Sequence, residues 1–178
     1  MLVLHSYSCE TRRMIDAVTS PRPPTRTRPP EPPSAYVHPD VYDELKYNGK
    51  WRADQLAGGV LIGRRLRCEE TNTEYVEVEG YVVGTHAVDV ADIRRHFTSH
   101  WKAAAAAQRN HLPNGEIVGW YLSTGNESLD LDQETLLLHH TFFSHPWQVC
   151  LLLRGDSLDS LQADGDGLLR KSGGIIRD

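Results

Sequence analysis

The sequence has few cysteines, and they form no recognisable motif. Cys9, Cys68 and Cys150 lie far apart in the chain, and no C-x-x-C pair occurs. An odd number of isolated cysteines indicates neither a disulfide framework nor a cysteine zinc site. We therefore expect a reducing compartment and a cytoplasmic location.

Long apolar runs and an excess of basic residues are also missing. No stretch approaches the roughly 20 apolar residues that cross a bilayer, and the apolar opening ends at His5, before a secretory signal could form. The formal net charge is −5, whereas nucleic-acid-binding proteins are typically basic. We therefore expect neither a membrane nor a nucleic acid as the partner.

Proline is concentrated near the N-terminus. Residues 19–33 are rich in proline and have almost no apolar side chains. Because proline fixes φ and lacks an N–H donor, this composition favours an extended, solvated conformation. We expect residues 1–33 to be a disordered extension and residues 34–178 to form a single domain. A docking strip for a partner with an aromatic groove is the alternative to a simple linker.

Beyond this extension, the apolar pattern predicts alternating helices and strands. Pro39 is at a typical first helical position, and the runs Gly58–Gly63 and Trp147–Leu153 are typical of buried strands. Asp130 and Gln133 resemble a capping pair at the start of a second helix. With short edge strands near the C-terminus, this order predicts an α+β fold with a curved, mixed sheet flanked by helices.

The segment Glu74–Val83 alternates between apolar and polar residues, as a half-exposed strand does. Val76 and Val78 are expected on its buried face. The opposite face, which should meet water or a partner, comprises Tyr75, Glu77, Glu79 and Tyr81.

The segment from Asp89 to about Asn110 has the strongest helical pattern in the chain. A run of alanines gives it high helix propensity. His96 and His100 are four residues apart on this helix, a spacing that can bind zinc, but the glutamate of H-E-x-x-H is missing. We therefore favour packed or solvent-facing histidines over a zinc-binding pair. The apolar stripe of this helix consists of Ile93, Phe97, Trp101 and Ala104.

Two segments bounded by glycine resemble a known family. In Gly115–Gly125, an apolar strand containing Gly-Trp-Tyr leads into small residues, which resembles the MPN/JAMM signature G-x-x-x-G-W-Y followed by H-S-H-P. Gly58–Gly63 matches the family's second landmark, E-x-x-G-x-L-x-G. The resemblance covers roughly residues 35–178. It implies an MPN/JAMM-like, cytidine-deaminase-like layered fold.

The resemblance also assigns positions to the family's zinc site. In that family two histidines bind zinc, a downstream serine and aspartate complete the site, and a glutamate on an earlier strand is the general base. Leu122 and Thr124 occupy the histidine positions here, with Ser123 between them, and Leu56 occupies the glutamate position, or Gln55 if the alignment slips by one residue.

These residues cannot build the family's zinc site. Leu122 has no lone pair, the hydroxyl of Thr124 is a poor zinc ligand, and Leu56 cannot accept a proton from water. Thr135 stands at the position of the family's acid, and the nearest carboxylate is that of Asp132. We therefore expect no zinc and no other cofactor.

The same substitutions resemble the catalytically silent MPN branch, which includes non-catalytic subunits of the proteasome lid, the COP9 signalosome and translation initiation factor three. Those relatives are scaffolds that pair with a second MPN domain through helical faces. The resemblance implies a pseudoenzyme and protein-interaction module that forms a homodimer or pairs with another MPN protein. The candidate interface residues are Phe97 and Trp101 on the helix and Tyr75 and Tyr81 on the strand.

Two other functions are left open. One is a divergent metallo-isopeptidase or peptidase that acts on a ubiquitin-like protein, with a metal site rebuilt around Asp132, His139 or His140. For these histidines, capping of a helix end is favoured over metal binding. The other is a pocket for a small ligand or peptide tail, with backbone N–H groups around residues 123–126 as donors.

Overall fold

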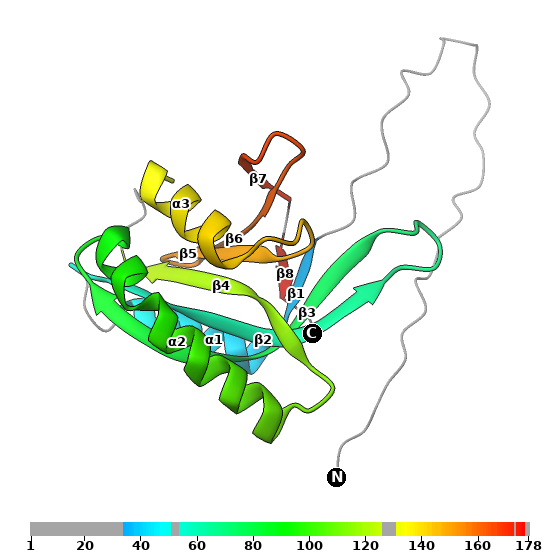
Figure 1. The fold of residues 1–178 in the computed structure, drawn as a ribbon, viewed down its shortest axis with the longest axis horizontal. Coiled ribbons are helices and arrows are strands. Elements are labelled where there is room, and N and C mark those ends of the chain that lie inside the picture. The colour runs from blue at the N-terminus through cyan, green and yellow to red at the C-terminus, as the bar shows by residue number, and fades with distance from the viewer. Residues whose placement is uncertain (1–33, 51–53, 126–130, 173, 177–178) are drawn as a thin grey trace, which may run out of the picture. The chain divides into compact units, whose positions relative to one another are not determined.

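The computed structural model describes residues 34–50, 54–125, 131–172 and 174–176, so the expected N-terminal extension lies outside the described residues (Figure 1). The strands form one sheet in the order β7-β6-β5-β4-β2-β3-β1-β8. The pairs β1–β3, β1–β8 and β4–β5 are parallel and the others antiparallel. The strands are β1 (Ala35–Val37), β2 (Leu56–Arg67), β3 (Glu74–Ala87), β4 (Glu116–Thr124), β5 (Val149–Arg154), β6 (Ser157–Ala163), β7 (Leu169–Lys171) and β8 (Gly174–Ile176).

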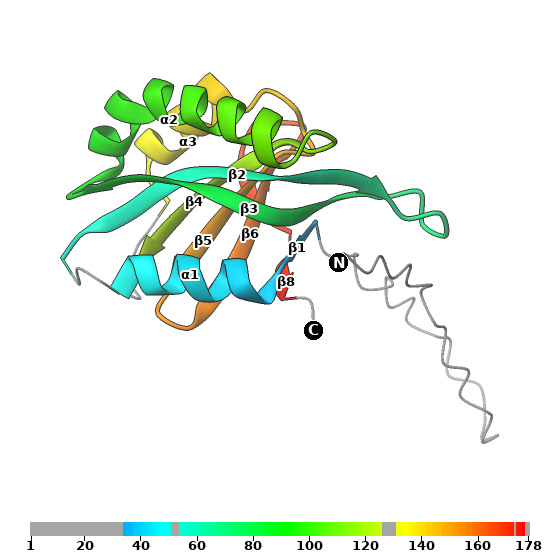
Figure 2. The same cartoon turned by 90° about the horizontal axis from the view of Figure 1, so that it is seen from below.

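Helices cover both faces of this sheet, which confirms the predicted α+β class. Helix α1 (Pro39–Lys50) lies on one face, and α2 (Val90–His111) and α3 (Gln133–Phe142) lie on the other (Figure 2). None of the described helices combines the length and apolar character that a bilayer crossing requires.

The two helices on the second face begin at aspartate caps. The Asp89 side chain accepts a hydrogen bond from the backbone N–H of Asp92 at 2.8 Å, at the residue where the sequence predicted this helix to begin. Asp132 caps α3 by accepting from the N–H of Thr135 at 2.9 Å. The expected cap, Asp130, lies outside the described residues, and the observed capping pair lies two residues further along the chain.

Each face of the sheet has its own hydrophobic core. Beneath α1, the core includes Val37, Leu45, Leu61, Val76, Val78, Tyr121 and Leu151. Beneath α2 and α3, it includes Leu56, Ile93, Phe97, Trp120, Leu122, Leu138 and Phe143. Full burial of such side chains stabilises the fold by about 1.5–3 kcal/mol each.

The alternation predicted for β3 fails after Val78. Gly63 pairs with Val78 and Ile62 pairs with Gly80, so Glu79 has no partner in β2 and forms a bulge. The extra residue turns Tyr81 to the same face as Val78, where its ring meets that of Tyr121 at a centroid distance of 5.8 Å. Tyr81 is therefore part of the α1-side core, and its expected place on the opposite, polar face was wrong.

The sheet curves so strongly that its two ends approach each other. The hydroxyl of Ser34, next to β1, lies 3.0 Å from that of Ser160 on β6, although four strands separate β1 from β6 in the sheet. The Ser34 hydroxyl also lies 2.5 Å from that of Ser172, which follows β7 at the same end of the sheet as β6. This confirms the predicted curvature, whereas the sequence pattern missed β1 and β6.

Candidate functional site

The structure places three of the family-derived positions next to one another. Strands β2 and β4 pair with Ala57 opposite Ser123 and Gly58 opposite Leu122. One step further along this antiparallel register, Leu56 lies across from Thr124. Side chains alternate along each strand, so Leu56, Leu122 and Thr124 all belong to the face covered by α2.

Apolar packing fills the space that these three residues surround. Leu122 is fully buried, and Leu56 and Thr124 are nearly so. Ile93 of α2 packs over Gly58: a Cβ atom at residue 58 would lie 2.9 Å from two carbons of Ile93 and 3.4 Å from Leu122. The glycine thus allows α2 to sit directly on the sheet. The pocket that a small ligand or peptide tail would need at Leu122 is closed by Ile93.

Ser123 lies on the other face of β4. Its hydroxyl donates to the backbone carbonyl of Leu45 at 2.8 Å, within the α1-side core. Leu45 is a fully buried residue within α1. Ser123 therefore connects β4 to α1 and does not contribute to the face that holds Leu122 and Thr124.

Asp132 and Thr135 form a helix cap. The backbone N–H of Thr135 and the side-chain hydroxyl of Thr135 both donate to the same carboxylate oxygen of Asp132, at 2.9 and 2.8 Å. Asp132 is exposed, and Thr135, at the position of the family's acid, is fully buried and has no carboxylate. Both residues have a structural role at the start of α3.

His139 is buried between β4 and α3, a placement that sequence reasoning missed. The indole N–H of Trp120 donates to His139 Nδ1 at 3.1 Å, and the imidazole stacks on Phe143. A neutral His139 therefore carries its proton on Nε2, which has no hydrogen-bond partner among the described residues. Burial, followed by the proximity of His140, lowers the pKa of His139 to about 4.

The residues proposed for a rebuilt metal site have other roles. Trp120 occupies the lone pair of His139, and His140 is exposed with its Nε2 2.6 Å from the carbonyl of Gly167. Within residues 34–50, 54–125, 131–172 and 174–176, no three His, Cys, Asp or Glu side chains are grouped as metal ligands would be. The described donors therefore do not suit a zinc-activated water.

The four candidate interface residues differ in what they expose. Phe97 is fully buried among Trp120, Phe142 and Phe143, so it is a core residue and its assignment to an interface was wrong. Tyr81 belongs to the α1-side core. Trp101 and Tyr75 are half-buried and keep part of their rings at the surface.

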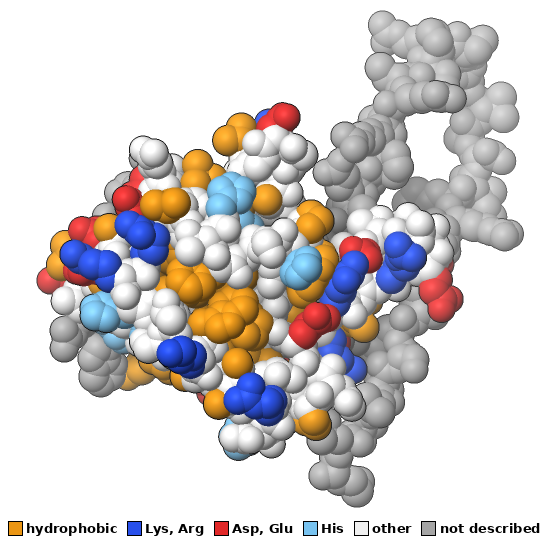
Figure 3. All heavy atoms as spheres, viewed as in Figure 1, with side chains coloured by type: hydrophobic (Ala, Val, Ile, Leu, Met, Phe, Trp, Pro, Cys, Tyr) orange, Lys and Arg blue, Asp and Glu red, His pale blue; other side chains and the backbone are white. Residues whose placement is uncertain are grey.

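Trp101 belongs to an apolar area at the surface of the second face. Its ring packs on Phe142 and Phe143 at centroid distances of 6.2 and 5.3 Å. Figure 3 shows hydrophobic side chains gathered at the centre of this face, with Lys and Arg side chains around part of it. We call this area the α2–α3 patch; it comprises the partly buried residues Trp101, Leu112, Ile117 and Phe142.

Comparisons with known proteins give a fold and no family. No family model matches the chain, and no curated protein matches it. Among solved structures, it is similar to the solution structure of protein DSY2949 from Desulfitobacterium hafniense, with a TM-score of 0.53. The two sequences are 15% identical, and the match covers 81% of this chain and 93% of that one. At this identity the likeness concerns the fold alone.

Proposed function

We propose that this chain is a catalytically inactive MPN-like domain that acts as a scaffold or protein–protein interaction module in the cytoplasm. One observation carries the proposal: the three positions that the resemblance assigns to zinc binding and proton transfer lie together on one face of the sheet. Strands β2 and β4 bring Leu56, Leu122 and Thr124 together, as an alignment of these residues with the MPN zinc site requires.

The chemistry of these positions supports the inactive branch of the family. Leu56 and Leu122 offer no donor atoms, and Ile93 of α2 occupies the space between the sheet and the helix. A zinc-bound water would need both nitrogen or oxygen ligands and an open coordination position. The hydrolase alternative has no support from Asp132, His139 or His140, since each has another partner.

The α2–α3 patch is the surface that we assign to the partner, a second MPN domain. Aromatic residues with one exposed edge are typical interface anchors, because they bury a large area at low entropic cost. Trp101 has this form, and Lys102 and Arg109 are exposed on the same helix. We therefore expect a partner that presents an apolar surface bordered by acidic residues.

The proposal is tested by metal content and by restoring the family's ligands. The wild-type chain, purified without a metal-chelating tag, should contain background zinc and leave a ubiquitin-like conjugate uncleaved. A Leu122→His/Thr124→His/Thr135→Asp variant should bind zinc, because its histidines share one face of β4. The matched control, Ser123→His/Thr124→His/Thr135→Asp, places one histidine on the opposite face and should bind zinc more weakly.

Near-stoichiometric zinc in the wild-type chain, together with cleavage of the conjugate, would contradict the inactive assignment. Equal zinc affinity of the two triple variants, both shown to be folded by circular dichroism, would instead contradict the alignment with the MPN signature.

A further inference from the structure

The outer edge of β3 is open over half of its length. Strand β2 pairs along the inner side of β3 as far as Ala87, whereas β1 pairs with the outer side only at residues 76–78. Among the residues that the structure describes, no strand pairs with the outer side of Gly80–His86. Figure 2 shows this edge between α1 and α2. Such an edge presents backbone N–H and C=O groups that can pair with another strand.

This edge lacks the side chains that usually prevent pairing. Gly80–His86 reads Gly-Tyr-Val-Val-Gly-Thr-His and contains no Lys, Arg, Asp, Glu or Pro. A second bulge lies here, since Val82 pairs with Val60 but Thr85 pairs with Gly58. A bulge can blunt an edge by twisting it, but this one leaves Val83, at the midpoint of the segment, 54% exposed.

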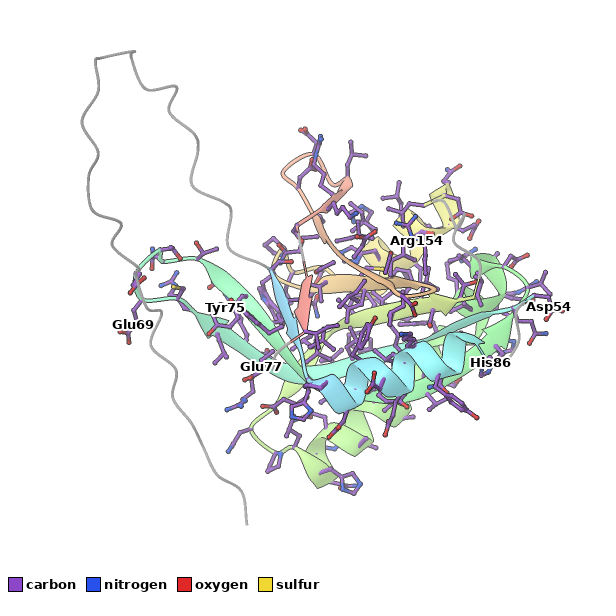
Figure 4. The ribbon with its side chains drawn as sticks, turned by 180° about the vertical axis from the view of Figure 1, so that it is seen from behind. Asp54, Glu69, Tyr75, Glu77, His86 and Arg154 are labelled. Atoms are coloured by element: carbon purple, nitrogen blue, oxygen red, sulfur yellow. The ribbon has the colours of Figure 1, made fainter. Side chains whose placement is uncertain are left out.

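Other exposed apolar side chains lie near the same edge. Val88 follows β3 and is 73% exposed, and Tyr47 on α1 is 60% exposed. The end of α1 is held beside β3 by Asn48, whose side chain donates to the Tyr81 hydroxyl at 3.2 Å and whose carbonyl lies 3.3 Å from His86 Nε2. Figure 4 shows His86 next to this end of α1.

We propose that the open edge of β3 binds a second copy of this chain, strand to antiparallel strand, so that the two sheets become continuous. A twofold interface requires a surface that complements itself. Two identical antiparallel edges meet this requirement, because a residue that lies before the axis on one copy faces the residue the same number of positions after the axis on the other copy. With the axis at Val83, the two Val83 side chains meet.

The flanks of the edge favour a second copy because their polar groups complement each other. Helix α1 runs in the same direction as β3, since the N–H of His38 donates to Val78 and Asn48 lies at His86. The Glu44 carboxylate faces the Tyr81 hydroxyl, in the first half of the edge segment. In the twofold arrangement the second α1 runs in the opposite direction, which brings Glu44 near His86 of the second copy.

This inference rests on the proposed scaffold function, because it names a second copy of the chain as one partner of the scaffold. The surface used, the open edge of β3, differs from the α2–α3 patch. The test uses the full chain with Cys9 and Cys68 replaced by serine and a single cysteine introduced in turn at residues 81–86. Under mild oxidation, the variant whose cysteine lies at the twofold axis should form a disulfide-linked dimer. Leu137→Cys is the control, because Leu137 is 45% exposed on α3, away from the edge.

The mass in solution provides a second measurement. By sedimentation, the wild-type chain should be a dimer, and Val83→Lys should raise the dissociation constant roughly tenfold or more, because two ammonium groups would meet at the axis. Leu137→Lys should remain a dimer. Circular dichroism establishes that both variants are folded.

A monomeric wild-type chain, a folded Val83→Lys variant with unchanged dimerisation, or equal cross-linking at residue 137 would overturn the inference. The failure of this inference is distinct from that of the scaffold proposal. A monomer with background zinc would leave the inactive MPN-like assignment in place and remove only the second copy as partner.

Discussion

Replacement of Gly58 by alanine tests whether α2 is seated on the family-derived zinc positions. The new methyl group would lie 2.9 Å from two Ile93 carbons, closer than real Cβ atoms are found, and 3.4 Å from Leu122. Both neighbours are fully buried, so the strain cannot be relieved towards solvent. Overpacking of this kind costs about 1–3 kcal/mol. We expect Gly58→Ala to lower the free energy of unfolding by about 2 kcal/mol, measured by urea denaturation.

A double-mutant cycle isolates the contact responsible. Ile93→Val alone should cost about 1 kcal/mol, because it removes a buried methyl group. In the Gly58→Ala background, removing this Ile93 methyl group makes room for the new alanine methyl group. The double variant should therefore lose less free energy of unfolding than the sum of the losses in the two single variants. Gly80→Ala is the matched control, since a Cβ atom there meets nothing within 4 Å. The reasoning is refuted if Gly58→Ala is as stable as Gly80→Ala, or if the two losses at residues 58 and 93 simply add.

Three further predictions concern His139, Trp101 and Ser123. Because the folded-state pKa of His139 is lowered to about 4, the unfolded chain binds the proton more readily below its ordinary pKa of about 6.5. Stability should therefore fall between pH 6.5 and pH 4, by up to about 3 kcal/mol from this group, and His139→Gln should remove that part of the pH dependence of denaturation. Trp101→Ala should destabilise the domain by about 2 kcal/mol and release the partner of the α2–α3 patch; a folded variant in a complex of unchanged mass would contradict its interface role. Ser123→Ala removes the hydrogen bond from the Ser123 hydroxyl to the Leu45 carbonyl and should lower the thermal midpoint by an amount equivalent to about 1 kcal/mol, whereas Ser123→Thr, which keeps a hydroxyl, should lower it less.

The sequence predicted the long elements because local signals were sufficient for them. Asp89 is a good cap, and a helical stripe follows it, so α2 was located within one residue at each end. The same stripe could not distinguish core from interface. Phe97 and Trp101 follow one another on that stripe, and only the position of α3 shows that Phe97 is covered by Phe142 and Phe143.

The errors arose where structure depends on residues distant in the chain. Tyr81 changes face because Glu79 bulges against β2, and strict alternation cannot reveal a bulge. Strand β1, with three residues, is ordered by pairing with β3 and β8 and carries little local signal. The Trp120–His139 hydrogen bond joins a strand to a helix that follows it. The pairing of β2 with β4 could be expected only through the family resemblance.

The packing at Leu122 closes the sheet face that carries the family-derived zinc positions. Access to the face that holds Leu56, Leu122 and Thr124 would require α2 to move and expose Ile93 and Leu122, at a cost of about 1.5–3 kcal/mol for each side chain. Exposing both side chains would leave the accessible state populated in roughly one molecule in 150 to one in 25,000. Binding at the surface has no such cost. The α2–α3 patch and the β3 edge are on different elements, so a dimer formed through β3 would leave the patch accessible to another protein. In that case Val83→Lys should weaken the dimer and leave binding at Trp101 intact, and Trp101→Ala should do the reverse.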